Sequence, residues 1–264
     1  MKKVLYIFMS IILLASCQKE SHVPAPEETV VTYTVQTPVE FEVKSGENGT
    51  GSEINALWYG VYHKKWDGSY KYMNDMSAYR TVGNASEKIS VPITLFKDQE
   101  YKIAFIAQHR SDDGVYTYIL KDGQTVLSED QFAEMVLNPK AEIANGEQLD
   151  AFVYWEKTGV IKHDNKKEIT LSRPLAQINI TTTATTKPAS IDVEVSTEGN
   201  QIANFTGLTC TDNHLATVYI LPPASGKVTL DLTKYDDDKN IIGTKNIPGV
   251  AVAKNFKTNI QGEI

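Results

Sequence analysis

The residue types that could carry out catalysis or bind a metal are few in this chain, and their spacing matches no known motif. The five histidines are far apart, at positions 22, 63, 109, 163 and 214. The sequence has no G-x-S-x-G, H-E-x-x-H or P-loop pattern and no C-x-x-C pair. Cys210 lies among polar residues with no basic neighbour to lower its pKa. We therefore predict no catalytic residue, no metal site, no bound cofactor and no enzymatic activity.

The three acids Asp236, Asp237 and Asp238 are the nearest approach to a metal ligand set. They lack the spacing of an EF-hand loop. We expect them to form a solvated turn between strands, with calcium binding as the less favoured alternative.

Aromatic residues cluster in one short stretch and could bind a ligand. Trp58, Tyr59, Tyr62 and Trp66 lie within nine residues, and Tyr70 and Tyr72 follow. An exposed aromatic ring can stack on the apolar C–H face of a sugar. Alternation along a strand places Trp58 and Tyr59 on opposite faces, so some of these rings are expected to be exposed or in an interface. The other interpretation is that they fill a core.

The N-terminus reads as a targeting segment followed by a modified cysteine. Lys2 and Lys3 precede a mostly apolar run, Val4 to Leu14, which is too short to span a bilayer. The sequence Leu14-Ala15-Ser16-Cys17 resembles the lipobox of bacterial lipoproteins. The resemblance implies cleavage between Ser16 and Cys17 and a covalent lipid on Cys17, which anchors firmly because each buried methylene adds roughly 0.8 kcal/mol. A chance cysteine at an ordinary cleavage site is the alternative.

The residues after Cys17 indicate where the protein works. Gln18-Lys19-Glu20 resembles the export signal of Bacteroidota surface lipoproteins, although only one acid is present. This implies an outer-membrane, lipid-anchored protein that faces the cell surface. Residues 1–16 are then a signal peptide. Residues 17–31 form the lipidated cysteine and a polar tether that contains two prolines.

Charge excludes one class of partner. Removing Lys2 and Lys3 from the 26 basic residues leaves 24 against 33 acidic ones, a net charge of −9. The sequence has no basic stripe with interleaved aromatics, so we expect no nucleic-acid partner. The negative charge also disfavours adhesion to anionic lipid, so the membrane link is the lipid itself.

After the tether the sequence alternates with the period of a β-strand. In residues 32–43 the apolar side chains are Tyr33, Val35, Val39, Phe41 and Val43, and Pro38 predicts an edge strand or a break. A Gly-rich loop follows Lys44. Further strands are expected at 55–62, 69–73, 88–96, 101–108, 115–120 and 149–155, and one short helix at 129–137. A second series of strands begins near residue 167.

Many short, evenly spaced strands indicate β-sandwiches rather than βαβ units. About fourteen strands are too many for one small sandwich. We predict two domains, residues 32–166 and 167–264, with the boundary in the polar stretch that begins at His163.

Two segments, and a weaker match over three more, resemble the fimbrillin-like (Mfa-like and FimA-like) surface lipoproteins of Bacteroidota. Ile169 to Ile180 is similar to their L-x-R-P-x-A-x-I-x-I strand, and Ile247 to Gly262 to their closing strand pair. A weaker match covers Ala56 to Tyr62, Tyr101 to Gln108 and Leu149 to Phe152. The resemblance implies two transthyretin-like β-sandwich domains and a pilus subunit or accessory protein in adhesion.

The same resemblance implies a route of assembly. In pilus-forming members a protease cuts after the first strand, the strand leaves, and a strand from the next subunit takes its place. Lys44 is the candidate cut site here. The alternative is an ordinary first strand with a solvated Lys44, since the cut residue of the best-known branch is arginine. A glycan-binding surface lipoprotein that uses Trp58, Tyr59, Tyr62 and Trp66 is the second function that the sequence allows.

Overall fold

The computed structural model describes residues 26–36, 54–82, 88–112, 126–127 and 147–264, and this part of the chain is all-β. Its only helical segments are two 3₁₀ turns, η1 (Asn74–Met76) and η2 (Glu147–Leu149). The helix expected at 129–137 and the strand expected at 115–120 lie outside the described residues.

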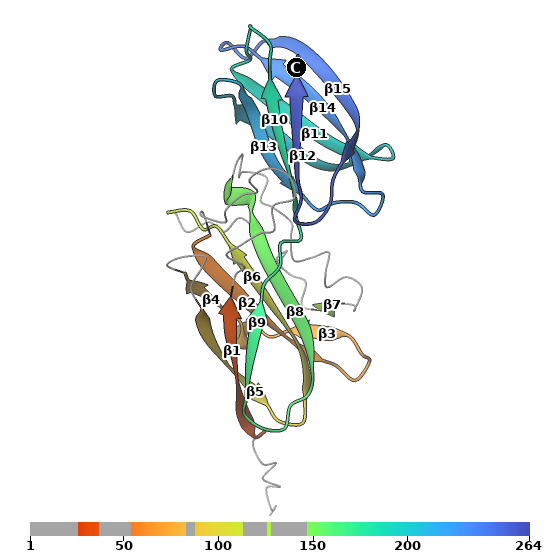
Figure 1. The fold of residues 1–264 in the computed structure, drawn as a ribbon. Coiled ribbons are helices and arrows are strands. Elements are labelled where there is room, and N and C mark those ends of the chain that lie inside the picture. The colour runs from red at the N-terminus through yellow and green to blue at the C-terminus, as the bar shows by residue number, and fades with distance from the viewer. Residues whose placement is uncertain (1–25, 37–53, 83–87, 113–125, 128–146) are drawn as a thin grey trace, which may run out of the picture.

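The first sandwich is built from two sheets (Figure 1). One has the order β5-β1-β9 and the other β7-β3-β2-β6-β8, with β4 also paired to β2. The strands are β1 (Glu28–Gln36), β2 (Ala56–Lys64), β3 (Tyr70–Tyr72), β4 (Ala78–Thr81), β5 (Ile89–Phe96), β6 (Glu100–Gln108), β7 (Val126–Leu127), β8 (Ala151–Val160) and β9 (Asn165–Thr170).

The core of this sandwich follows the period-two pattern of its strands. Val31, Tyr33 and Val35 of β1 point inward and are buried, as the alternation predicts. They pack in one cluster with residues such as Ile93 of β5 and Phe105 of β6. The described part of β1 ends at Gln36, and residues 37–43 of the expected strand lie outside the described residues.

Strands β2 and β6 lie in the middle of the larger sheet and are buried on both faces. Leu57 and Tyr59 face the core that contains β1, whereas Trp58 and Tyr62 belong to a second cluster that continues into the other sandwich. A strand buried on both faces is apolar throughout, which explains why β2 and β6 carry such long apolar runs.

The second sandwich also has two sheets, of orders β13-β10-β16 and β12-β11-β14-β15. Its strands are β10 (Ala176–Thr182), β11 (Ser190–Thr197), β12 (Asn200–Thr209), β13 (His214–Ile220), β14 (Lys227–Tyr235), β15 (Ile241–Ala251) and β16 (Lys257–Gly262). The acids at 236–238 form the turn between β14 and β15, where the Asp236 carboxylate accepts the Asn240 amide at 2.8 Å.

The segment Ile169–Ile180, expected as one strand that opens the second domain, is two strands in different sheets. β9 pairs in parallel with β1, from Val31 opposite Asn165 to Gln36 opposite Thr170, and so belongs to the first sandwich. The expected boundary at 166/167 falls inside this strand. The sheets change between Leu171, which packs in the first core, and Leu175, which packs in the second. That the halves fold as separate domains stays a prediction.

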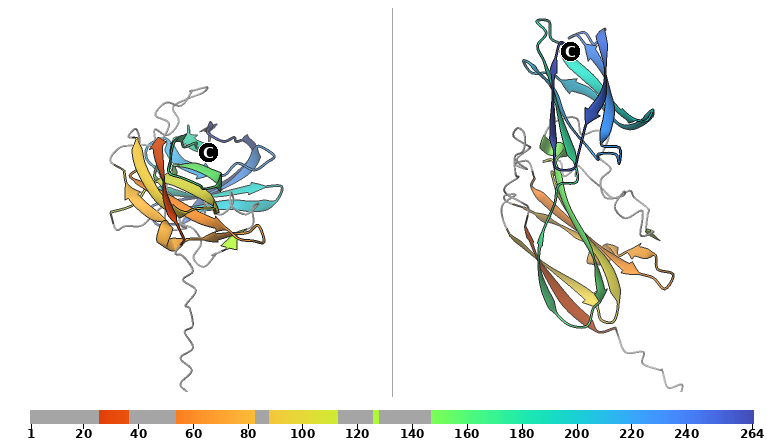
Figure 2. Two further views of the ribbon diagram at one scale, coloured as in Figure 1. Left: turned by 90° about the horizontal axis from the view of Figure 1, so that it is seen from below. Right: turned by 45° about the vertical axis from the view of Figure 1, so that its right-hand side comes forward.

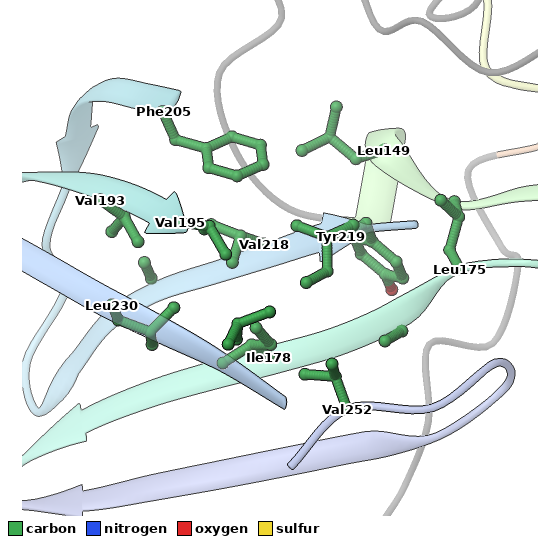
Figure 3. Close-up of a cluster of buried hydrophobic side chains, with 14 of the residues drawn as sticks. Leu149, Leu175, Ile178, Val193, Val195, Phe205, Val218, Tyr219, Leu230 and Val252 are labelled. Carbon is green, nitrogen blue, oxygen red and sulfur yellow. The ribbon is translucent and has the colours of Figure 1, made fainter. Parts of the chain in front are cut away.

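The two sandwiches lie end to end (Figures 1 and 2). A buried ion pair lies where they meet. Arg173 and Asp150 are 5% and 0% exposed, and the Arg173 Nε donates to the Asp150 carboxylate at 2.6 Å. Arg173 also reaches Asn255 of the second sandwich at 3.3 Å. Figure 3 shows Leu149 of η2 and Leu175, which precedes β10, directed toward the second core, so η2 of the first sandwich also contributes an apolar side chain to that core.

In the part of the chain that the structure describes, no helix has the length and apolar character to cross a bilayer.

Candidate functional site: the first strand and its groove

Strand β1 is the first described element of the chain, yet it lies in the middle of a sheet. It runs antiparallel to β5, from Glu28 opposite Phe96 to Val35 opposite Ile89. On its other side it is parallel to β9. Because β1 has a ladder on each side, its loss would leave two unpaired strand edges facing one another across a groove.

The inward-facing side chains of β1 form part of the first core. The exposed fractions of Val31, Tyr33 and Val35 are 0%, 0% and 1%. The ring centroid of Tyr33 lies 5.1 Å from that of Phe105 in the facing sheet. Removing β1 would therefore open an apolar groove, and burying three such side chains contributes on the order of 1.5–3 kcal/mol each.

A polar cluster holds β1 against the strands around it. The Tyr33 hydroxyl donates to Glu156 of β8 at 2.7 Å, and the Lys167 ammonium of β9 donates to the same carboxylate oxygen at 2.6 Å. Tyr154 donates to the second Glu156 oxygen at 3.1 Å. Burial, and then the hydrogen bond to Glu156, raise the pKa of Tyr33, so it stays a neutral donor.

The cluster was not foreseen from the sequence, because Tyr33 and Glu156 are 123 positions apart. In the sequence, Glu156 follows the apolar run of β8 and Lys167 lies in a polar stretch. Charged residues at such positions are common in β-strands, so they do not indicate this cluster. A contact of this kind depends on the parallel pairing of β1 with β9.

The outer end of β1 is fixed by Asp164 in the β8–β9 connection. Its carboxylate accepts the Val30 amide at 2.8 Å and the Thr29 hydroxyl at 2.7 Å. These two hydrogen bonds, the Val30 amide first, lower the pKa of Asp164. Asp164 thus fixes the outer end of β1 through these two hydrogen bonds.

The residues expected to be processed lie outside the described part of the chain. Ser16 and Cys17 fall within residues 1–25, and Lys44 within residues 37–53. Their roles in cleavage and lipid attachment stay predictions. What the structure does place is the strand between them: β1 lies in the chain after Cys17 and before Lys44.

The four candidate ligand-binding aromatics are not brought together. Trp58, Tyr59 and Tyr62 are buried, with 3%, 6% and 1% of their surface exposed, whereas Trp66 is 96% exposed. These three rings are therefore not exposed: Tyr59 faces the first core, and Trp58 and Tyr62 pack in the cluster that continues into the other sandwich, as the core-filling and interface alternatives expect. Of the four, only Trp66 presents its ring to solvent.

The second cysteine has the environment of a packing residue. Burial raises the pKa of the Cys210 thiol to about 11, and its sulfur lies 3.7 Å from the Leu215 carbonyl. Among the described residues no group of histidine, cysteine and acidic side chains could hold a metal ion.

These features define a class of protein: a two-sandwich β protein whose N-terminal strand completes the first core. The chain belongs to a family described as a family of unknown function (DUF6562), whose sequence profile matches residues 58–202, more than half of the chain. The match begins inside β2 and ends inside β12, so it covers parts of both sandwiches.

Three solved structures of similar architecture are fimbrial proteins. A fimbrial assembly protein from Parabacteroides distasonis is 14% identical, with a TM-score of 0.42 over 91% of this chain and 92% of that one. The fimbrial anchor protein Mfa2 from Porphyromonas gingivalis is 14% identical, with a TM-score of 0.44 over 84% and 83%.

The third, the tip fimbrial protein Mfa3 from the same organism, is 8% identical, with a TM-score of 0.39 over 84% of this chain and 81% of that one. Values this low describe a loosely similar arrangement of strands and not a shared activity. The comparison with curated proteins yields no match.

Proposed function

We propose that this protein is a lipid-anchored outer-membrane protein of the cell surface that serves as a fimbrial subunit or accessory protein in adhesion, and that a strand from another subunit can replace its first strand. The observation that carries the proposal is the position of β1. It is the first strand of the body, and it lies between β5 and β9 with its inner side chains buried.

Loss of β1 from this position is unfavourable unless another strand replaces it. Without β1 the ladder edges of β5 and β9 are unpaired, and the apolar groove that held Tyr33 faces water. Both defects are repaired by another extended segment with alternating apolar residues, which supplies main-chain hydrogen bonds and fills the same pockets. The empty groove therefore favours association with a second chain.

A single proteolytic cleavage after β1 would have two consequences. The β1 strand is joined to the rest of the body only through residues 37–55, and Lys44 is the only lysine or arginine between Lys19 and Lys64. A cut after Lys44 separates β1 from the body. It also separates the body from Cys17 and its lipid, so the released body and the opened groove arise together. This role needs no catalytic step and no cofactor from the chain itself.

The experiment is cleavage of the mature lipoprotein in outer-membrane vesicles with a lysine-specific protease. We expect a new N-terminus at Ser45 and movement of the folded body from the vesicle to the soluble fraction. Size-exclusion chromatography should then show multimers that the uncut protein does not form. Both proteins carry Lys19→Gln, because a cut after Lys19 would also free the body from the lipid on Cys17. In this background the matched variant Lys44→Gln should remain uncut in this segment and membrane-bound.

Two results would contradict the proposal. One is a body that is cut after Lys44 and stays monomeric while it keeps its own β1. The other is multimer formation by the Lys44→Gln variant to the same extent as by the wild type.

A further inference from the structure

The hairpin between β2 and β3 displays a tryptophan that has no structural role in a core. Trp66 is 96% exposed, and the next most exposed large apolar side chain in the described part of the chain, Ile241, is at 64%. An indole left in water makes no contribution to burial on folding. The hairpin projects sideways from the first sandwich, where neither sheet covers it (Figures 1 and 2).

The hairpin turn that presents this ring is held by local hydrogen bonds. The Lys65 amide donates to the Ser69 carbonyl at 2.7 Å, and the Gly68 amide donates to the Lys65 carbonyl at 3.0 Å. The Asp67 carboxylate accepts the Ser69 amide at 2.9 Å. Gly68 has a φ of 82°, which glycine adopts without strain. A ring on such a turn loses little freedom when it contacts a ligand.

A hollow of about 560 Å³ lies beside the ring, between the hairpin, the β5–β6 turn and the end of β8. Its lining includes His63, Lys64, Trp66, Gln99, Glu100 and Val160. Apart from the indole and the half-exposed Val160, the side chains in this lining are polar. The His63 Nε2 atom donates a hydrogen bond to the Gln99 side-chain oxygen at 2.8 Å, and the Gln99 side-chain nitrogen is a further donor in this lining.

The charges around the hollow are balanced. Lys64 and Lys65 stand against Asp98 and Glu100 in the lining, so the four formal charges cancel. Lys64 pairs with Glu100 at 2.6 Å, and Lys65 pairs with Asp67 at 3.6 Å. A highly charged ligand would find no excess of opposite charge here, and a protein partner would find little apolar area beyond one ring.

We propose that this hollow is a saccharide-binding site for a neutral glycan, with the Trp66 ring stacked on the C–H face of one sugar ring. Gln99, His63 and Glu100 are placed to bond the hydroxyls of the same sugar. Stacking on an indole together with a few fixed polar groups is how a shallow site can select a neutral, hydroxyl-rich ligand. The proposal does not rest on the fimbrial role, because the site involves neither β1 nor Lys44.

The test is an array of immobilised glycans probed with the mature chain, followed by titration with the best soluble oligosaccharide. The array holds neutral glycans from bacterial surface polysaccharides, neutral glycans from animals and plants as a separate set, and acidic glycans. We expect binding to neutral glycans, and the set that binds identifies the source. Trp66→Ala should raise the dissociation constant at least about tenfold, and Trp66→Phe, which keeps a ring, much less.

Two further variants make the test specific. Gln99→Ala removes a hydrogen-bonding group and should raise the dissociation constant several-fold. Phe256→Ala removes another half-exposed ring in the second sandwich and should change nothing. The Trp66→Ala protein should still be cut after Lys44 like the wild type, so failure of this proposal and failure of the fimbrial role are told apart.

The proposal is overturned if the chain binds no neutral glycan, if it prefers acidic glycans, or if Trp66→Ala binds as tightly as the wild type. Capture of a protein partner through Trp66 with no glycan affinity would also overturn it.

Discussion

At the scale of single residues, Gly60 shows how a missing side chain positions a large one. Trp58 and Gly60 lie on the same face of β2, and a Cβ at residue 60 would come 2.2 Å from the Trp58 Cη2 atom. The indole therefore lies along the strand over the glycine. In that position it stacks with Tyr72, with ring centroids 6.4 Å apart and planes 27° apart.

We predict that Gly60→Ala lowers the free energy of unfolding by about 1–3 kcal/mol, because the methyl group overpacks the Trp58 ring. Urea unfolding followed by tryptophan fluorescence measures the change. Gly262→Ala is the matched control, since no atom lies within 4 Å of its added Cβ. Equal effects of the two substitutions would contradict this explanation of Gly60.

Cys210 gives a second prediction at this scale. Burial raises the pKa of its thiol to about 11, so little thiolate exists at neutral pH. Alkylation by iodoacetamide at pH 8 should be slower than that of an unperturbed thiol by a factor on the order of a hundred, because the thiolate is the reacting form. Mass spectrometry over time gives the rate, and rapid labelling of the folded protein would show that the thiol is accessible and ionised.

At the scale of secondary-structure elements, the alternation of apolar residues predicted the inward side of β1 and the existence of most other strands. It did not predict which strands pair. The pairing of β1 with β9 is parallel and joins residues more than 130 positions apart, so no local pattern reports it. The one predicted strand over Ile169–Ile180 breaks at Arg173 and Pro174, because Arg173 turns into the joint and proline has no amide to donate.

The side-chain alternation does not predict strand β12. Its sequence, NQIANFTGLT, has weak alternation, and only Phe205 and Leu208 are buried. Two register shifts in its pairing with β11 interrupt the two-residue period. Side-chain pattern alone could not find such a strand.

The end of β1 supplies a prediction about pH. The folded-state pKa of Asp164 is lowered by the Val30 amide and the Thr29 hydroxyl, so its contribution to stability is present above the unfolded-state pKa and is lost as the pH falls through the folded value. Acidification from pH 5 to pH 3 should therefore reduce the hydrogen-exchange protection factor of the Val30 amide.

Protection is measured by NMR after correction for the intrinsic exchange rate. In Asp164→Asn this dependence should be weaker, because the amide does not titrate. A variant with the same loss of protection over this range would show that another carboxylate is responsible.

At the scale of the whole molecule, the buried pair of Asp150 and Arg173 joins the sandwiches. The Arg173 guanidinium lies 4.9 Å from the centroid of the Phe152 ring and also contacts Asn255. The polar stretch at His163 predicts a domain boundary there, whereas the sheets change between Leu171 and Leu175. Polarity of the sequence indicates exposure, but at this joint Leu171, Arg173 and Leu175 are buried.

Removing one partner of this pair leaves a buried charge without its counter-ion. We predict that Asp150→Ala lowers the free energy of unfolding by about 3–5 kcal/mol. Glu168→Gln is the control, because the pair of Glu168 with Lys88 is 3.8 Å long and largely exposed, and its loss should cost less than about 1 kcal/mol. Similar losses in both variants, measured by chemical denaturation, would contradict a structural role for the joint.

The proposed role requires that the groove of β1 accept a strand from another chain. Fluorescence anisotropy can measure the uptake of a fluorescent peptide with the sequence of residues 26–36, both by protein cut after Lys44 and by uncut protein. We expect uptake of about one peptide per cut molecule and none by uncut protein. We also expect no uptake of a peptide with Tyr33→Asp, because that position is fully buried. No uptake by the cut protein, or equal uptake by the uncut protein, would contradict the proposed role.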